Sequence, residues 1–216
     1  FSPGTERLAR TAVEHGVVAG LSPARLRKEV IHTLEEPQAI PAIERWEQLG
    51  LLAAMWPGLH LTDAGRAYLH RTDSVLAWYN GLGVKHRVER WLMLLLALLA
   101  PMEPTAAGEF VATRLHLRTK HQEVLNDALA GLAPLCEVLE RSWRGRGRKG
   151  VRAREVYWAC RGLPVEALLL AVIASGADRA RDRVALYLRE LRHVRPRLTG
   201  DRLIAMGMRP GPKVGA

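Results

Sequence analysis

Hydrophobic residues recur along most of the chain at the three- and four-residue spacing of an α-helix, not at the alternating spacing of a strand. In the clearest example, Val184, Leu188 and Leu191 fall on one helical face and the neighbouring arginines fall largely elsewhere. This spacing predicts helices over residues 5–15, 23–34, 37–49 or 41–49, 63–70, 75–82, 86–99, 105–115, 121–141, 154–161, 164–175 and 178–194.

Capping residues set many of these boundaries. Ser22 followed by Pro23 is a typical helix start, because the serine oxygen can accept a backbone N–H and proline suits the first turn. Thr62 can cap a helix over 63–70, and Thr72 or Asp73 can cap a separate helix over 75–82. Glycine and proline content predicts linkers at 81–83, 101–104, 145–150 and 196–200.

No segment is a strong strand candidate and no internal repeat is present. We therefore expect an all-α protein, an elongated array of many helices. The longest apolar run, residues 91–100, is too short to cross a bilayer and indicates a fully buried helix.

The charge of the chain is high and unevenly placed. The net charge is +10, but residues 1–82 hold 8 Lys and Arg against 9 Asp and Glu, whereas residues 83–216 hold 24 against 13. A basic half of this kind indicates a polyanionic partner such as nucleic acid. An arginine-rich proteome that places arginine on every solvated face would explain part of the excess but not the asymmetry.

Basic residues gather in three places in this half. The densest, residues 141–161, holds eight Lys and Arg against one acid, and includes a glycine-rich loop at 144–150. Trp143, Tyr157 and Trp158 border the loop, so base stacking is expected beside phosphate binding. The second set is Arg114, Arg118, Lys120 and His121, and the third is Arg189, Arg192, Arg195 and Arg197.

The C-terminal segment predicts a short helix, a sharp turn and the start of another helix. Asp201 suits an N-cap, Gly207 suits a left-handed position, and a Pro-Gly-Pro turn follows. The turn would present backbone N–H groups between Arg209 and Lys213, which is a favourable site for a phosphate. The candidate RNA-binding residues are therefore Arg118, Lys120, Arg144, Arg146, Arg148, Lys149, Arg195, Arg197, Arg209 and Lys213.

No catalytic or cofactor motif accompanies these residues. The sequence has no paired carboxylates spaced for two metal ions, no P-loop, no Gly-x-Gly-x-x-Gly and no Cys-x-x-Cys. We expect no catalytic residue, no metal site and no cofactor in this chain. Cys136 and Cys160 lie far apart in apolar surroundings and indicate free thiols of a reducing, cytoplasmic compartment, since no signal peptide is visible.

One segment of the acidic half favours a different function. Residues 37–69 contain Gly-Leu-Leu followed by Leu-Thr-Asp-Ala-Gly-Arg, which resembles the end of a winged-helix unit in DNA-binding regulators. That fold would need a short β-hairpin around 51–61. A third possibility is a helical scaffold whose positive charge is incidental.

Four segments carry motifs of one family. Residues 21–30 read Leu-Ser-Pro-Ala-Arg-Leu-Arg-Lys-Glu-Val, residues 49–59 contain Gly-Leu-Leu and Pro-Gly-Leu, and residues 110–120 contain Arg-Leu-His-Leu-Arg-Thr-Lys. Most specific is the run Pro-Arg-Leu-Thr-Gly-Asp-Arg-Leu with Pro-Gly-Pro-Lys-Val-Gly within 194–215. Together they resemble the region after the catalytic head of bacterial tRNA nucleotidyltransferases and poly(A) polymerases, the CCA-adding family. Ala24 and Thr119 depart from the Glu and Ser usual there.

The resemblance implies a neck-like helical domain over 1–82, a body-like domain over 83–150 and a tail-like domain over 151–216 that is cut short. In that family the head binds Mg²⁺ and ATP or CTP, and it would lie upstream of Phe1. The chain would then be a non-catalytic fragment that grips tRNA, or another RNA 3′ end, while the head adds nucleotides. It would not be a membrane protein.

Overall fold

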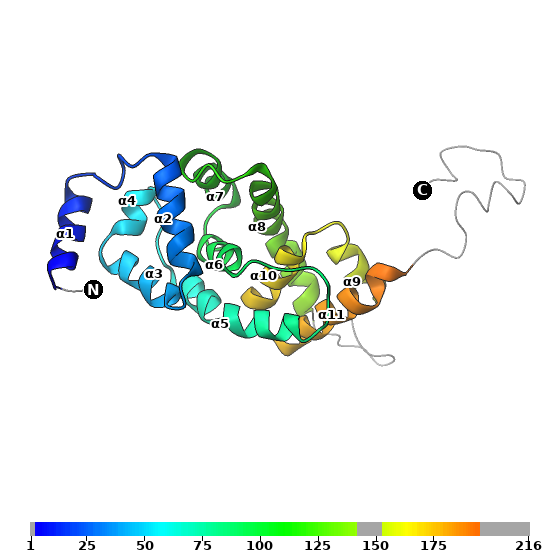
Figure 1. Ribbon diagram of the computed structural model, residues 1–216. Helices are drawn as coiled ribbons and strands as arrows, with labels where there is room; N and C mark the ends of the chain where they lie inside the picture. The colour runs from blue at the N-terminus through cyan, green and yellow to red at the C-terminus, as the bar shows by residue number, and fades with distance from the viewer. Residues whose placement is uncertain (1–2, 142–152, 195–216) are drawn as a thin grey trace, which may run out of the picture.

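The computed structural model describes residues 3–141 and 153–194. No strand occurs in either stretch, so the all-α prediction is confirmed (Figure 1). The elements are α1 (Pro3–Glu14), α2 (Pro23–Glu35), α3 (Ala39–Gln48), α4 (Leu51–Met55), α5 (Asp63–Asn80), α6 (Arg90–Leu99), α7 (Pro104–Glu109), a π-helical turn (Phe110–Arg114), α8 (Thr119–Glu140), α9 (Ala153–Cys160), α10 (Val165–Ser175), α11 (Asp178–Arg189) and a 3₁₀ turn (Leu191–His193).

Helices α6 and α10 form the centre of the molecule. α6 is buried from Trp91 to Leu99, and α10 from Glu166 to Ile173. Helices that are apolar on every side have to be surrounded, and α10 packs against α8, α5, α6 and α11. Figure 1 shows the elongated result, with α1 to α4 at one end and α9 and α11 at the other.

Two predicted helix starts are confirmed. The Ser22 side chain accepts the Arg25 N–H at 3.4 Å, and the Thr62 side chain accepts the Gly65 N–H at 3.0 Å. Each bond satisfies one of the donors that a first helical turn leaves unpaired. Leu26, the first buried residue of α2, then begins the stripe that faces α6.

The predicted break between residues 70 and 75 is wrong. α5 runs without interruption from Asp63 to Asn80. Thr72 is fully buried, and its hydroxyl donates to the Tyr68 carbonyl at 3.0 Å instead of capping a new helix. Burial of Thr72 and Val75 on the core side therefore overrides the local preference of threonine for a cap.

The predicted helix start at residue 86 is also wrong, because α6 begins at Arg90. Residues 84–89 form an extended connection, which we call the strap. The Tyr79 hydroxyl donates to the His86 carbonyl at 2.9 Å, and the His86 ring lies 3.1 Å from a Glu166 oxygen. These tertiary contacts hold the strap in an extended path across α10.

The segment predicted as one helix over 105–115 divides into α7 and the π-helical turn. Glu103 caps α7, since its carboxylate accepts the Ala106 N–H at 2.9 Å, and this backbone bond lowers the pKa of Glu103. His116, just beyond the turn, has a positive φ of 45°. Near the C-terminal end, the helix predicted over 178–194 stops at Arg189 and continues as the 3₁₀ turn.

The hairpin required by a winged helix is absent at 51–61. Gly50, with φ of 74°, ends α3, and the chain continues directly into helix α4 and a turn. The Leu61 N–H donates to a Glu47 carboxylate oxygen at 3.0 Å, which ties the turn back to α3. The structure therefore contradicts the winged-helix alternative at the feature that would distinguish it.

Buried residues from Val18 to Leu188 belong to one hydrophobic cluster. The division at residues 82 and 150 stays a prediction. Within the two described stretches, no single helix is long and apolar enough to cross a membrane, and only α9 and α10 together, bent by 118°, reach that length and composition. The run at 91–100 forms a buried helix as predicted.

Candidate nucleic-acid interface

Several arginines of this chain bind backbone carbonyls at helix ends. Arg114 is the clearest: its guanidinium donates to the carbonyls of Leu21 and Val18, both at 2.6 Å, and to those of Ala19 at 2.9 Å and Met55 at 3.3 Å. Arg114 therefore joins the π-helical turn to the 18–21 loop and to the end of α4. Arg114 belongs to the same basic set in the sequence as Arg118 and Lys120, but its guanidinium is used within the fold.

The same arrangement recurs between other helices. Arg183 of α11 donates to the carbonyls of Val138 and Arg141 at 3.0 and 2.9 Å, at the end of α8. Arg71 of α5 donates to the Ile173 carbonyl at 3.1 Å, at the end of α10. Helix C-termini carry partial negative charge and unpaired carbonyls, so a guanidinium suits them. Part of the positive charge is thus used within the fold.

Arg90 is a further structural arginine. Its Nε and one terminal nitrogen donate to the two Asp73 oxygens at 2.7 and 2.9 Å, and another nitrogen donates to the Glu36 carbonyl at 3.1 Å. The guanidinium hydrogen-bonds the carboxylate, which lowers the pKa of Asp73 and raises that of Arg90. α6 is thereby fixed to α5 and to the end of α2.

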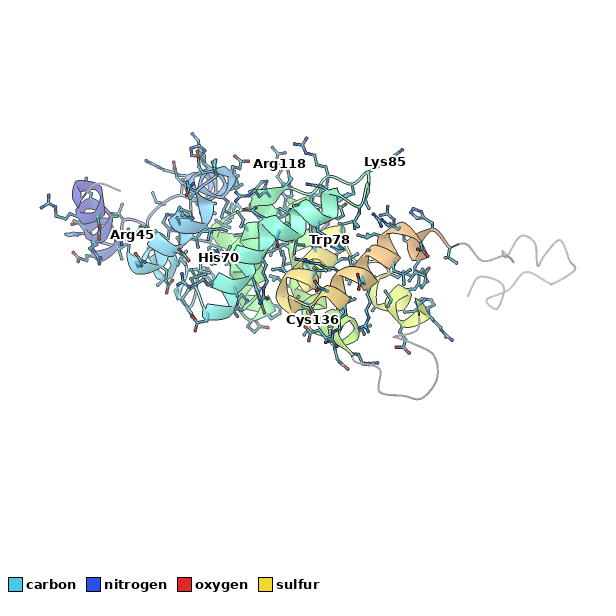
Figure 2. The ribbon with its side chains drawn as sticks, turned by 90° about the horizontal axis from the view of Figure 1, so that it is seen from below. Arg45, His70, Trp78, Lys85, Arg118 and Cys136 are labelled. Atoms are coloured by element: carbon cyan, nitrogen blue, oxygen red, sulfur yellow. The ribbon has the colours of Figure 1, made fainter. Side chains whose placement is uncertain are left out.

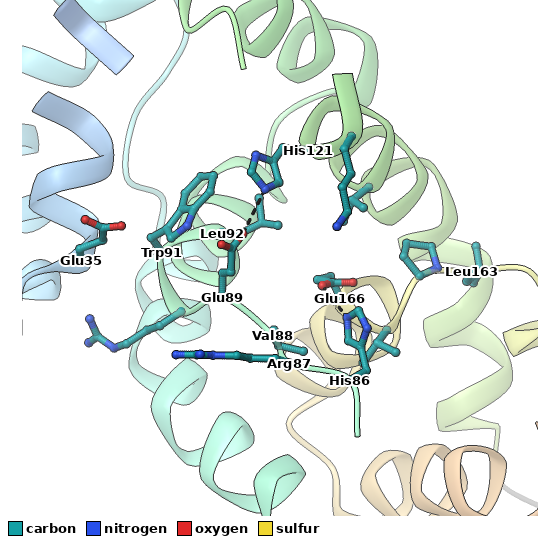
Figure 3. Close-up of a pocket in the computed structure, with 15 residues that line it drawn as sticks. Glu35, His86, Arg87, Val88, Glu89, Trp91, Leu92, His121, Leu163 and Glu166 are labelled. Atoms are coloured by element: carbon teal, nitrogen blue, oxygen red, sulfur yellow. Dashed lines mark hydrogen bonds and ion pairs between the residues drawn. The ribbon is translucent and has the colours of Figure 1, made fainter. Parts of the chain in front are cut away.

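A hollow of about 960 Å³ opens beside the strap (Figure 3). The strap, the start of α6, the start of α8 and the start of α10 surround it. Three carboxylates line it: Glu35, Glu89 and Glu166. Glu166 lies 3.1 Å from the His86 ring, and Glu89 lies 3.1 Å from the His121 ring. The basic residues that line it are His86, Arg87, Arg90, Lys120 and His121.

A second hollow of about 350 Å³ lies where the strap begins, between it and the end of α11. Lys85 contributes from the strap, and Arg189, Arg192 and His193 contribute from the other side. The strap therefore separates two hollows, each lined by cations. It brings together residues almost 110 positions apart in the sequence.

Cations without an internal partner gather on this side. Lys85, Arg87, Arg118 and Lys120 are exposed, and none of them forms a hydrogen bond or ion pair with another described residue. Figure 2 places Arg118 and Lys85 along the same edge of the molecule. We name this surface the basic track; its residues are these four cations, the exposed Arg189, and the half-buried Arg192, whose Nε donates to the His193 ring at 3.1 Å.

The track includes two of the ten residues predicted to bind RNA, Arg118 and Lys120, which lie at the start of α8. The others lie outside the described residues: Arg144, Arg146, Arg148, Lys149, Arg195, Arg197, Arg209 and Lys213. Sequence reasoning missed Lys85 and Arg87, because a helix was expected from residue 86. The available signal was the basic run directly after Gly83.

The two cysteines are free thiols, as predicted. Burial raises the pKa of Cys160 to about 12 and that of Cys136 to about 11, so both resist ionisation at neutral pH. In the described part of the chain, no cluster of three or more His, Cys, Asp or Glu side chains is placed to hold a metal ion.

Three comparisons relate the chain to known proteins. It is 32% identical over 99% of its length to an A-adding tRNA nucleotidyltransferase of Geobacter sulfurreducens, of which it spans 24%. A solved structure of a CCA-adding enzyme in an apo form has a TM-score of 0.75 and 22% identity to this chain. The match covers 99% of this chain and 48% of the enzyme's chain. The structure of a Thermotoga maritima CCA-adding enzyme complexed with tRNA has a TM-score of 0.73 and 23% identity to this chain. That match covers 97% of this chain and 48% of the enzyme's chain.

No protein-family model matches the chain. It spans about a quarter of the curated relative and about half of each of these solved structures. The solved structures share its helical fold, and the curated relative is similar in sequence over 99% of the chain. The chain thus corresponds to part of a tRNA nucleotidyltransferase, the family that its four motifs indicated.

Proposed function

We propose that this chain is the RNA-holding, non-catalytic part of a tRNA nucleotidyltransferase, and that it binds tRNA along the basic track. The carrying observation is the set of exposed cations beside the strap that have no internal partner, on a fold shared with a CCA-adding enzyme complexed with tRNA. Lysine and arginine side chains in such a row suit the phosphates of an RNA backbone.

Nucleotide addition itself is assigned, in this proposal, to a catalytic head that precedes the chain in the whole protein. Related solved structures include complexes with ATP and with CTP, which fits a head that uses these nucleotides with Mg²⁺. The two hollows beside the strap contain no metal-ligating cluster among their described residues. The proposed work of this chain is to hold RNA while the head acts, in the cytoplasm.

The residues outside the described stretches extend this proposal. Arg195 and Arg197 directly follow the end of the track in sequence, and the Arg144–Lys149 loop joins α8 to α9. We propose that these residues and the turn with Arg209 and Lys213 add phosphate contacts.

The test is a double substitution in the track, Arg87→Ala with Lys120→Ala. We expect weaker tRNA binding and a smaller slope of log K against log salt, by about 0.7–0.9 for each phosphate that is no longer neutralised. The charge-matched control is Arg7→Ala with Arg25→Ala, since these exposed arginines lie on α1 and α2, outside the track. An unchanged slope in the track variant would contradict the proposed surface.

A further inference from the structure

Helix α9 presents an exposed tryptophan at the end of the molecule opposite α1. Trp158 is 56% exposed, whereas the other described tryptophans are buried or half-buried. Tyr157 meets its ring edge-on with 5.3 Å between centroids. An indole left in water on a helix surface gives up the stabilisation that burial would provide. Val194, 64% exposed, lines the same hollow, so the two side chains form an exposed apolar patch of the kind that marks an interaction site.

Hollows flank Trp158 on two sides. One, of about 660 Å³, is lined by Arg154, Tyr157, Trp158, Arg161, Leu191 and Val194. Another, of about 560 Å³, shares Arg154 and Trp158 and extends to the end of α8. Both volumes lie in the range of about 300–1,000 Å³ that is usual for sites of small planar ligands. The indole therefore stands between two open spaces.

The charge around this ring favours an anion. The Arg161 guanidinium lies over one face of the Trp158 ring, 5.0 Å from its centroid, and 5.8 Å from the Tyr157 centroid, so a base would stack on the other face of the indole. Arg154 lines both hollows; Glu155 lines the smaller one, and the larger has no acidic residue in its described lining. An aromatic ring beside two arginines is the combination that binds a stacked base with its phosphates.

The larger hollow also adjoins the basic track. Leu191 and Val194 line it, and Arg192, which belongs to the track, lies between them in the 3₁₀ turn region and lines the second strap hollow. An RNA strand held on the track would thus reach Trp158 without leaving the basic surface.

We propose that Trp158 stacks an unpaired nucleobase of the bound RNA, while Arg154 and Arg161 contact the phosphates on either side of it. This inference rests on the proposed RNA binding and names its ligand more closely: a single-stranded nucleotide, not a duplex. Any base can stack on the ring, so the site distinguishes a single strand from a duplex and does not distinguish one base sequence from another.

The experiment compares Trp158→Ala and Trp158→Phe in the full chain. The probes are a single-stranded oligoadenylate of about 12 nucleotides and an RNA duplex of equal charge. We expect Trp158→Ala to bind the single strand about tenfold more weakly, with the same salt slope and an unchanged duplex affinity, because base stacking is removed and every cation is retained. Trp158→Phe should retain most of the affinity.

The exposed Leu8 on α1 gives a matched control, and Leu8→Ala should bind both probes like the wild type. If Trp158→Ala binds the single strand as tightly as the wild type does, this inference is overturned and the proposed function still stands. Loss of all RNA binding by the wild type would instead overturn the proposed function.

Tryptophan fluorescence tests whether the Trp158 ring is covered by RNA or by another part of the chain. The difference between wild type and Trp158→Phe isolates the Trp158 emission, which iodide should quench in the free protein and oligoadenylate should protect. A Trp158 emission already shielded from iodide without RNA would show that another part of the chain covers the ring, and would overturn the inference.

Discussion

At the scale of single residues, arginine has two different uses in this protein. Arg114 and Arg118 are four positions apart and belong to one basic set in the sequence, yet Arg114 bonds backbone carbonyls and Arg118 is exposed without a described partner. Which use applies depends on which carbonyls the fold brings within reach. Composition could therefore predict a basic surface, but it could not separate arginines that bond to the backbone from arginines that stay exposed.

Replacement of Arg114 separates these uses. We expect Arg114→Ala to lower the free energy of unfolding by about 2–4 kcal/mol, because several carbonyls lose a charged donor. Arg114→Lys should recover only part of that stability, since an ammonium lacks the planar fork of donors. Urea unfolding measures both.

The control for Arg114 is its neighbour. Arg118→Ala should change the free energy of unfolding by no more than about 0.5 kcal/mol, as is usual for an exposed side chain. If Arg118→Ala lost as much stability as Arg114→Ala, the distinction between a carbonyl-bonding Arg114 and an exposed Arg118 would be contradicted.

At the scale of elements, local signals located the helices and tertiary contacts decided where some of them end. Ser22 and Thr62 cap helices as predicted, because a cap needs only the first turn of its own helix. Thr72 does not, because its place in the core is set by residues that precede and follow it at helical spacing. The strap was missed for a related reason: His86 is held by Tyr79 and by Glu166, and Glu166 is 80 positions away in the sequence.

The bond between Asp73 of α5 and Arg90 of α6 predicts a pH dependence. Since the folded protein lowers the pKa of Asp73, the pair contributes stability that is fully present above the ordinary aspartate value near 3.8 and is lost as the pH falls through the folded value. Asp73 is well exposed, so solvent screens the pair and we expect only about 0.5–1 kcal/mol.

Comparison of wild type with Asp73→Asn tests this. The difference in urea unfolding should be constant from pH 7 to about pH 5 and should shrink below pH 4. Glu103 also has a lowered pKa and affects both proteins alike, so the difference isolates Asp73. If the stability difference between the two proteins grew as the pH fell, the predicted direction of the pH dependence would be contradicted.

At the scale of the whole molecule, the sequence motifs identified the family before the fold was known. Three of their segments meet in the structure: the Arg114 guanidinium of the third donates to the Leu21 carbonyl of the first and to the Met55 carbonyl of the second. The motifs contain only part of the basic track, Arg118 and Lys120. Lys85 and Arg189, remote in sequence, line one hollow because α5 and α11 both pack against α10.

The most direct test of the account is binding of the wild-type chain to labelled tRNA over a salt series, beside a DNA duplex of similar charge. We predict a preference for tRNA and a log K that falls steeply with log salt, as expected when several phosphates are neutralised. Equal or tighter binding to the DNA duplex, or no binding to either, would contradict the assignment of this chain as the RNA-holding part of a tRNA nucleotidyltransferase.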